Sequence, residues 1–205
     1  MDSSALSPEL LIALTAFALV SSITPGPNVL MLVASSANFG IRRTLPHAIG
    51  IPLGFCGMII VLGLGLGEIL KAVPWVLETL RIVCALYIAY LAWNIARAGS
   101  MSETGARGRP LRWHEAAAFQ WVNPKAVAMA LGSLAIYAPG GTMLEVFVVA
   151  AVFALVCVPA EATWLFAGSK LKHFLTNPLR LRVFNVTMAL LLVGSVGWAL
   201  AFAYS

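Results

Sequence analysis

Six long apolar segments constrain the fold of this chain more than any other feature of its sequence. They run approximately over residues 9–35, 46–68, 72–96, 116–138, 142–168 and 183–204. A helix needs about 20 mostly apolar residues to cross the hydrocarbon core of a bilayer. With 60% hydrophobic and only 10% charged residues, a soluble fold of this size would lack the polar residues that its surface needs. We therefore predict an all-α integral membrane protein with six transmembrane helices.

The basic residues predict how these helices are oriented. The loops after the first, third and fifth segments carry ten Lys and Arg residues, whereas the opposite loops carry Lys71 and Arg81. Basic loops remain in the cytoplasm, so we expect the first set to be cytoplasmic and both termini to lie outside. The net charge of +5 does not indicate nucleic-acid binding, because the basic residues do not alternate with aromatic residues. The ten are Arg42, Arg43, Arg97, Arg107, Arg109, Arg112, Lys170, Lys172, Arg180 and Arg182.

A polar stretch in the middle of the chain divides the six segments into two groups of three. We expect a single membrane domain with halves at 1–98 and 114–205, joined by a flexible polar loop at 99–113. Because each half has an odd number of spans, the second half enters the membrane in the opposite direction. Two related halves would form an inverted repeat with broken first and fourth helices, a plan that is common in secondary transporters.

The first segment of each half contains residues that interrupt a helix: TPGPN at 24–28 and NPK at 123–125. Proline removes a backbone donor and clashes with the preceding turn, and an unpaired backbone group in lipid costs several kcal/mol. A break that faces a cavity would offer amides to the carboxylate and carbonyls to the ammonium of a zwitterion. The alternative is a proline kink that only shapes helix packing. The candidate substrate-binding residues are Thr24, Pro25, Gly26, Pro27, Asn28, Asn123, Pro124 and Lys125.

Two charged residues lie inside apolar segments. Lys125 either takes part in transport or extends along its helix to the membrane surface. Glu161 is the candidate for proton coupling, and the alternatives are a site for a substrate ammonium or a structural ion pair with Lys125. The histidines His47, His114 and His173 lie at loops or segment ends, so no nucleophile with a neighbouring base is expected in the membrane. We therefore do not expect an enzyme.

Four stretches of the chain resemble the LysE/RhtB family of bacterial amino-acid exporters. They are TPGPN at 24–28, ANFGIRRTLPHAIGIPLGF at 37–55, ALYIAYLAWNIARA at 85–98 and QWVNPKA at 120–126. The resemblance implies a secondary transporter of the bacterial cytoplasmic (inner) membrane that moves amino acids outward, using the proton gradient. Within the family the chain is most similar to the branch that exports cysteine and O-acetylserine. Glu161 departs from the family pattern, in which an uncharged residue is expected.

The substrate is expected to be a small neutral amino acid, because no aspartate lies within an apolar segment to bind a strongly cationic one. The expected partners are this substrate, protons and membrane lipid. Homo-oligomerisation is left open, and no cofactor or metal is expected. The alternative is an exporter of divalent metal ions or another small solute, with related architecture. It would need several carboxylates or histidines in the membrane, and Glu161 is the acid well inside a segment.

Overall fold

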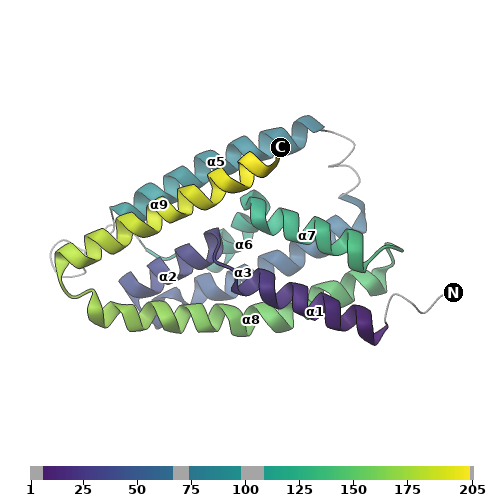
Figure 1. The fold of residues 1–205 in the computed structure, drawn as a ribbon, viewed down its shortest axis with the longest axis horizontal. Helices are drawn as coiled ribbons and strands as arrows, with labels where there is room; N and C mark the ends of the chain where they lie inside the picture. Colours follow the sequence, from purple (N-terminus) through teal and green to yellow (C-terminus); the bar gives the residue numbers. More distant parts are fainter. Residues whose placement is uncertain (1–6, 67–73, 98–108, 204–205) are drawn as a thin grey trace.

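The structure is a computed structural model that describes residues 7–66, 74–97 and 109–203. These ranges are helical apart from short connections (Figure 1), which confirms the predicted all-α class for the described residues. The helices are α1 (Pro8–Ile23), α2 (Pro27–Phe39), α3 (Ile41–Val61), η2 (Leu62–Leu66), α5 (Pro74–Ala96), α6 (Trp113–Val122), α7 (Pro124–Tyr137), α8 (Met143–Phe174) and α9 (Pro178–Ala203).

Several helices extend beyond the apolar segments that predicted them. The helix α3 begins at Ile41 rather than near residue 46, and α8 continues to Phe174 rather than ending near residue 168. The added turns carry basic residues such as Arg42 and Lys170, whose long side chains reach water while the backbone stays helical. The polar loop predicted at 99–113 lies mostly outside the described residues.

The described surface is apolar, as expected for helices in contact with lipid. By length and hydropathy, the stretches Ile41–Gly65 and Met143–Leu171 can each cross a membrane. Within the described residues, Pro8–Ile23 and Pro27–Phe39 can together form a third span that is bent by 49°. The chain is therefore a helical membrane protein, and the count of six spans stays a prediction. Large exposed apolar side chains include Ile12, Val20, Leu86, Leu155 and Leu190.

Helices from the two halves of the chain pack against one another. The helix α3 packs against α6 and α8, α2 packs against α8, and α5 pairs with α9. Figure 1 shows α5 and α9 side by side along one face of the molecule, with α8 along the opposite face. The main apolar core includes Phe55 and Met58 of α3 together with Phe153 of α8. Helices from both halves therefore contribute to one core.

Two of these helix pairs approach so closely that only glycine fits at the contact. A Cβ atom at Gly50 or Gly54 of α3 would overlap backbone atoms of α6. A Cβ atom at Gly168 of α8 would likewise overlap the Ser36 side chain and the backbone of α2. Small residues let helices approach closely in lipid, where burial of apolar surface no longer drives association. The contacts that hold α2 and α6 against the opposite half therefore depend on these three glycines.

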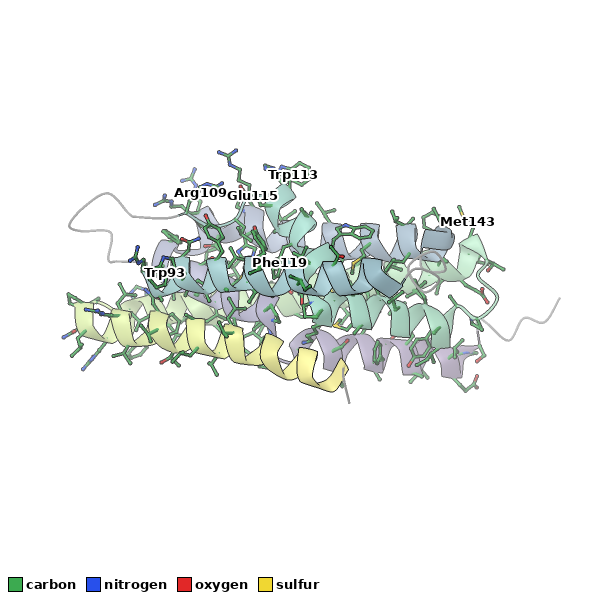
Figure 2. All side chains as sticks on the ribbon, turned by 90° about the horizontal axis from the view of Figure 1, so that it is seen from above. Trp93, Arg109, Trp113, Glu115, Phe119 and Met143 are labelled. Carbon is green, nitrogen blue, oxygen red and sulfur yellow. The ribbon has the colours of Figure 1, made fainter. Side chains whose placement is uncertain are left out.

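Basic residues lie at one end of the bundle near the α2–α3 connection and in the α8–α9 region, such as Arg42 and Arg180. Figure 1 shows the α8–α9 turn and the end of α2 at this end, opposite the start of α1 and the α7–α8 turn. Figure 2 shows Trp93 and Arg109 toward the same end, and Met143 at the other. The guanidinium of Arg97 lies 4.1 Å from the centre of the Trp93 ring, a cation–π contact. This segregation agrees with the predicted grouping of the basic loops on one side of the membrane.

Replacing Gly54 with alanine tests the close contact between α3 and α6. We expect Gly54→Ala to destabilise the protein by about 1–3 kcal/mol, because the new methyl group overlaps the Ala117 backbone. Gly57→Ala on the same helix is the control, since its Cβ would meet nothing within 4 Å, and it should hold or raise stability. Thermal unfolding in detergent measures both. Equal melting temperatures for the two variants would contradict this account of the contact.

Candidate functional site

Each helix break consists of a capping residue followed by a proline at the first position of the next helix. Gly26 precedes Pro27 at the start of α2, and Asn123 precedes Pro124 at the start of α7. Proline suits this position because its missing amide would be unpaired there in any case. The Asn123 side chain caps α7 by accepting a hydrogen bond from the Lys125 amide at 3.2 Å. The predicted interruptions are therefore confirmed at the residues that predicted them.

A small pocket of about 40 Å³ lies between the two breaks and the middle of α8. Two further polar side chains line the pocket, Ser22 and Cys157, which were not predicted as site residues from the sequence. Ser22 Oγ lies 3.3 Å from Cys157 Sγ. Thr24, Pro25, Pro27 and Pro124 belong to the breaks but do not line the pocket. The pocket brings together five of the predicted residues: Gly26, Asn28, Asn123, Lys125 and Glu161.

Lys125 reaches from the second break to the first. Its ammonium donates a hydrogen bond to the Thr24 carbonyl at 2.5 Å, at the C-terminal end of α1. Its methylene groups lie against Gly26, where a Cβ atom would approach Lys125 Cδ to 2.7 Å. Lys125 therefore crosses between the two halves of the chain instead of extending outward along α7. The carbonyl that was expected to meet a substrate ammonium is occupied by this lysine.

Glu161 lies in the middle of α8 and is only 6% exposed. Its Oε2 atom is buried and has no hydrogen-bond partner. Within the described residues no ion pair joins the Glu161 carboxylate to Lys125, whose ammonium binds Thr24 instead. A buried carboxyl group that lacks partners is costly when it is charged. Glu161 therefore brings a buried carboxyl oxygen without a hydrogen-bond partner to the wall of the pocket.

Gln120 contacts the pocket residue Asn28 and was not among the residues predicted from the sequence. Its side chain is fully buried and exchanges two hydrogen bonds with Asn28, at 2.8 and 3.2 Å. Gln120 Nε2 also donates to the Ala116 carbonyl at 2.8 Å. The amide of Asn28 is thus engaged across the interface between α2 and α6. A glutamine inside an apolar segment, two turns after Trp113, was the signal available in the sequence.

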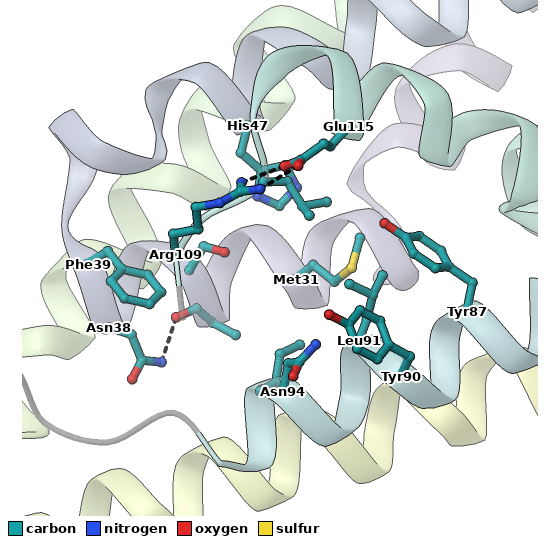
Figure 3. A pocket seen from close by; sticks show the side chains of 14 residues that line it. Met31, Asn38, Phe39, His47, Tyr87, Tyr90, Leu91, Asn94, Arg109 and Glu115 are labelled. Carbon is teal, nitrogen blue, oxygen red and sulfur yellow. Dashed lines mark hydrogen bonds and ion pairs between the residues drawn. The ribbon is translucent and has the colours of Figure 1, made fainter. Parts of the chain in front are cut away.

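A larger cavity of about 340 Å³ lies between α2, α3, α5 and the start of α6 (Figure 3). An ion pair forms part of its wall: Arg109 donates two hydrogen bonds to the Glu115 carboxylate, at 2.6 and 2.5 Å. The Arg112 amide donates a third to Glu115 at 2.8 Å. The Arg109 guanidinium lowers the pKa of Glu115 to about 2, so this carboxylate stays charged near neutral pH.

His47 also lines the larger cavity, and its predicted position was wrong. It was expected at the end of a segment, but α3 begins at Ile41, so His47 lies well inside the helix. Its side chain is fully buried, and neither ring nitrogen has a hydrogen-bond partner. Most buried polar groups are hydrogen-bonded, and an exception points to a ligand, a water molecule or a functional role.

Comparison with known proteins agrees with the motifs and the helical bundle. The family model described as LysE type translocator matches residues 19–204. The cysteine/O-acetylserine efflux protein of Escherichia coli (strain K12) is 28% identical over 193 residues, which covers 92% of this chain and 96% of that protein. The protein of the same description from Salmonella typhimurium (strain LT2) is 29% identical with the same coverage. No solved structure matches.

The reciprocal amide pair between Asn28 and Gln120 is open to a double-mutant test. Asn28→Leu or Gln120→Leu alone leaves one amide without its partner, and we expect each to destabilise the protein by about 1–3 kcal/mol. The double variant should lose less than the sum of the two, because neither amide remains unpaired. Thermal unfolding in detergent measures all three.

A matched control for this cycle is Thr15→Val, which removes an exposed hydroxyl that bonds only within α1. It should change the free energy of unfolding by no more than about 0.5 kcal/mol. Strictly additive effects of the two leucine variants would show that the pair is not coupled.

Proposed function

Because the chain belongs to the LysE family of translocators, we propose that it exports small neutral amino acids across the bacterial inner membrane in exchange for protons. It is a transporter rather than an enzyme. The relatives whose names specify cysteine and O-acetylserine efflux support a substrate of this size and charge. The observation that carries the proposal is the convergence of both helix breaks, Lys125 and Glu161 on one pocket.

The proposed architecture is a 3+3 inverted repeat of six spans, with halves 1–98 and 114–205. In it α1–α2 corresponds to α6–α7, α3 to α8 and α5 to α9. A two-fold axis is compatible with contacts between corresponding helices that lie close to it, and α3 packs against α8 while α5 packs against α9. It would also relate the α3–α6 contact to an α8–α1 contact, and both are present. The interrupted pairs α1–α2 and α6–α7 then form the first span of each half, as in other transporters with interrupted helices.

The proposed binding site for the amino acid is the pair of breaks, formed by Thr24 to Asn28 and by Asn123 to Lys125. Gly26 offers no side-chain cap to α2, so amides of the first turn are available to a substrate carboxylate at the positive end of the helix dipole. The Thr24 carbonyl suits a substrate ammonium, since it already accepts a hydrogen bond from the ammonium of Lys125. A zwitterion would therefore displace Lys125 from this carbonyl when it binds.

The pocket between the breaks is closed in this conformation. Its volume of about 40 Å³ holds only about three water molecules, which is too little space for an amino acid. Movement of the Lys125 side chain away from Gly26 would enlarge the pocket next to α2. We propose that this structure represents an occluded state without substrate, in which Lys125 holds the two halves together. Transport then requires a state in which that contact is broken.

Glu161 is the proposed proton carrier, because its carboxyl is buried in the pocket and one oxygen has no partner. A substrate ammonium that enters the pocket would favour the charged carboxylate, so substrate binding and proton release would be linked. Among the described residues no three His, Cys, Asp or Glu side chains gather to hold a metal ion. No observation therefore favours the divalent-metal alternative.

Uptake of labelled O-acetylserine into inverted membrane vesicles tests the proposed function. Export appears as uptake in these vesicles, and an acidic lumen should accelerate it. Glu161→Gln should abolish this acceleration while exchange of labelled for unlabelled substrate continues, because glutamine carries no exchangeable proton.

The control for this variant is Glu145→Gln, which changes another buried glutamate of α8. Glu145 is also 6% exposed, but its carboxylate accepts a hydrogen bond from the Thr142 amide at 2.9 Å and lies outside both cavities. It should keep the response to the pH gradient. A Glu161→Gln protein that responds like the parent would remove Glu161 from the coupling mechanism.

The proposed orientation, with both termini outside, is tested with cysteines at the two ends of α8. In a background without the native cysteines, Thr176→Cys in the α8–α9 turn should resist impermeant thiol reagents in intact cells. Pro139→Cys in the α7–α8 turn should be labelled, since that turn lies at the opposite end of the bundle. Both positions are exposed, so burial cannot explain a difference. The reverse labelling pattern would invert the orientation.

A further inference from the structure

The larger cavity has the size and composition of a ligand site, and the proposed transport mechanism does not use it. At about 340 Å³ it falls within the range of cavities that bind small molecules, about 300–1,000 Å³. The pocket between the breaks has about 40 Å³. Of these two cavities in the described part of the chain, the larger one therefore has room for an amino acid in this conformation, and the smaller one does not.

The charged groups of this cavity are balanced. The guanidinium of Arg109 and the carboxylate of Glu115 lie together in its wall, joined by two hydrogen bonds (Figure 3). The half-exposed side chain of Arg109 leaves room for a second acceptor. A solute with both a carboxylate and an ammonium would find one opposite charge for each. A solute with a net charge would leave one of its own charges, or one of the protein's, unbalanced.

The remaining wall supplies uncharged donors and acceptors. His47 is buried with both ring nitrogens unpaired, and such a group gains most from a ligand that hydrogen-bonds to it. Tyr87 and Asn94 of α5, with Ser35 of α2, face the same space. Figure 3 shows the His47 side chain on one helix and the Tyr87 and Asn94 side chains on another, around the same space. Polar groups that converge in this way on a partly apolar cavity are typical of small-molecule sites.

The two cavities lie one helical turn apart along the same helices. On α2, Met31 lines the larger cavity and Asn28 lines the smaller pocket; on α3, His47 lines the larger and Ile51 the smaller. Residues three or four apart share one face of a helix. On α2, Asn28 is thus the pocket residue one turn from Met31, and Gln120 holds its side chain through two hydrogen bonds. The two cavities are therefore neighbours along α2 and α3.

We propose that the larger cavity is a loading site that binds the zwitterionic substrate from the cytoplasmic side before it passes the Asn28–Gln120 pair to the pocket between the breaks. This inference rests on the proposed function for the direction and the class of the substrate. Its position fits, because Arg109 lies toward the end of the bundle where the basic residues gather. The loading site selects net-neutral amino acids through the balanced pair of Arg109 and Glu115.

Protection of an introduced cysteine tests the loading site directly. Ser35→Cys is placed in the purified, otherwise cysteine-free protein, and its reaction with N-ethylmaleimide is followed with and without O-acetylserine. At about ten times the dissociation constant, occupancy of the cavity should slow the reaction about tenfold. Lysine and aspartate, which carry net charges, should not protect. Ser169→Cys is the matched control, because the neighbouring Gly168 of α8 packs against Ser36 of α2 while Ser169 lies outside both cavities, and its labelling should not change.

A second variant separates direct occupancy from an indirect effect of substrate in the smaller pocket. Gly26→Val fills the space beside Lys125 and should stop transport, while O-acetylserine continues to protect Ser35→Cys. Loss of protection in this variant, with a monodisperse protein, would assign the effect to the smaller pocket and overturn the loading site. Normal transport by the parent with no protection of Ser35→Cys would overturn the loading site alone. If neither the native protein nor its cysteine-free form binds or transports O-acetylserine, the proposed function is overturned, and this inference with it.

Discussion

Two interrupted helices must satisfy their backbone inside an apolar bundle, and Lys125 links the two interruptions. Its amide is capped by Asn123 at the second break, and its ammonium binds the Thr24 carbonyl at the first. An unpaired backbone group in lipid costs several kcal/mol, and the second half supplies the partner that the Thr24 carbonyl of the first half needs. The small pocket lies beside this contact, with Lys125 and Glu161 both in its wall.

Two polar pairs lie beside the two cavities. The Asn28–Gln120 amide pair joins α2 to α6, with Asn28 in the wall of the smaller pocket, and the Arg109–Glu115 ion pair lies in the wall of the larger one. Each pair is internally satisfied, so each can part and re-form around a solute that offers equivalent hydrogen bonds. Glu161 and His47 differ, because they are buried without full hydrogen bonding. Because an unpaired buried polar group is costly, a proton or ligand that binds to it changes the free energy more than one that binds to a fully hydrogen-bonded group.

Much of the fold and part of the site could be predicted from the sequence. The helices follow the apolar segments, and the breaks fall at Gly26-Pro27 and Asn123-Pro124 because proline and a capping residue act within a single turn. The sequence also singled out Lys125, whose ammonium links the two breaks. It missed Gln120, whose partner Asn28 is 92 residues away. It misplaced His47, because hydropathy marks where a segment is apolar and not where its helix begins.

The sequence by itself determined that the chain folds as membrane helices and where two of them break, because hydropathy and proline sterics depend on neighbours within a few residues. Only the tertiary structure decided that Lys125 binds Thr24 rather than Glu161, and that a second, larger cavity lies beyond the first. These outcomes depend on distances between helices that are remote in the chain. The close approach of α3 to α6 at Gly50 and Gly54 is another such distance: the spacing of the two glycines permits a close contact, but only the fold decides which helix makes it.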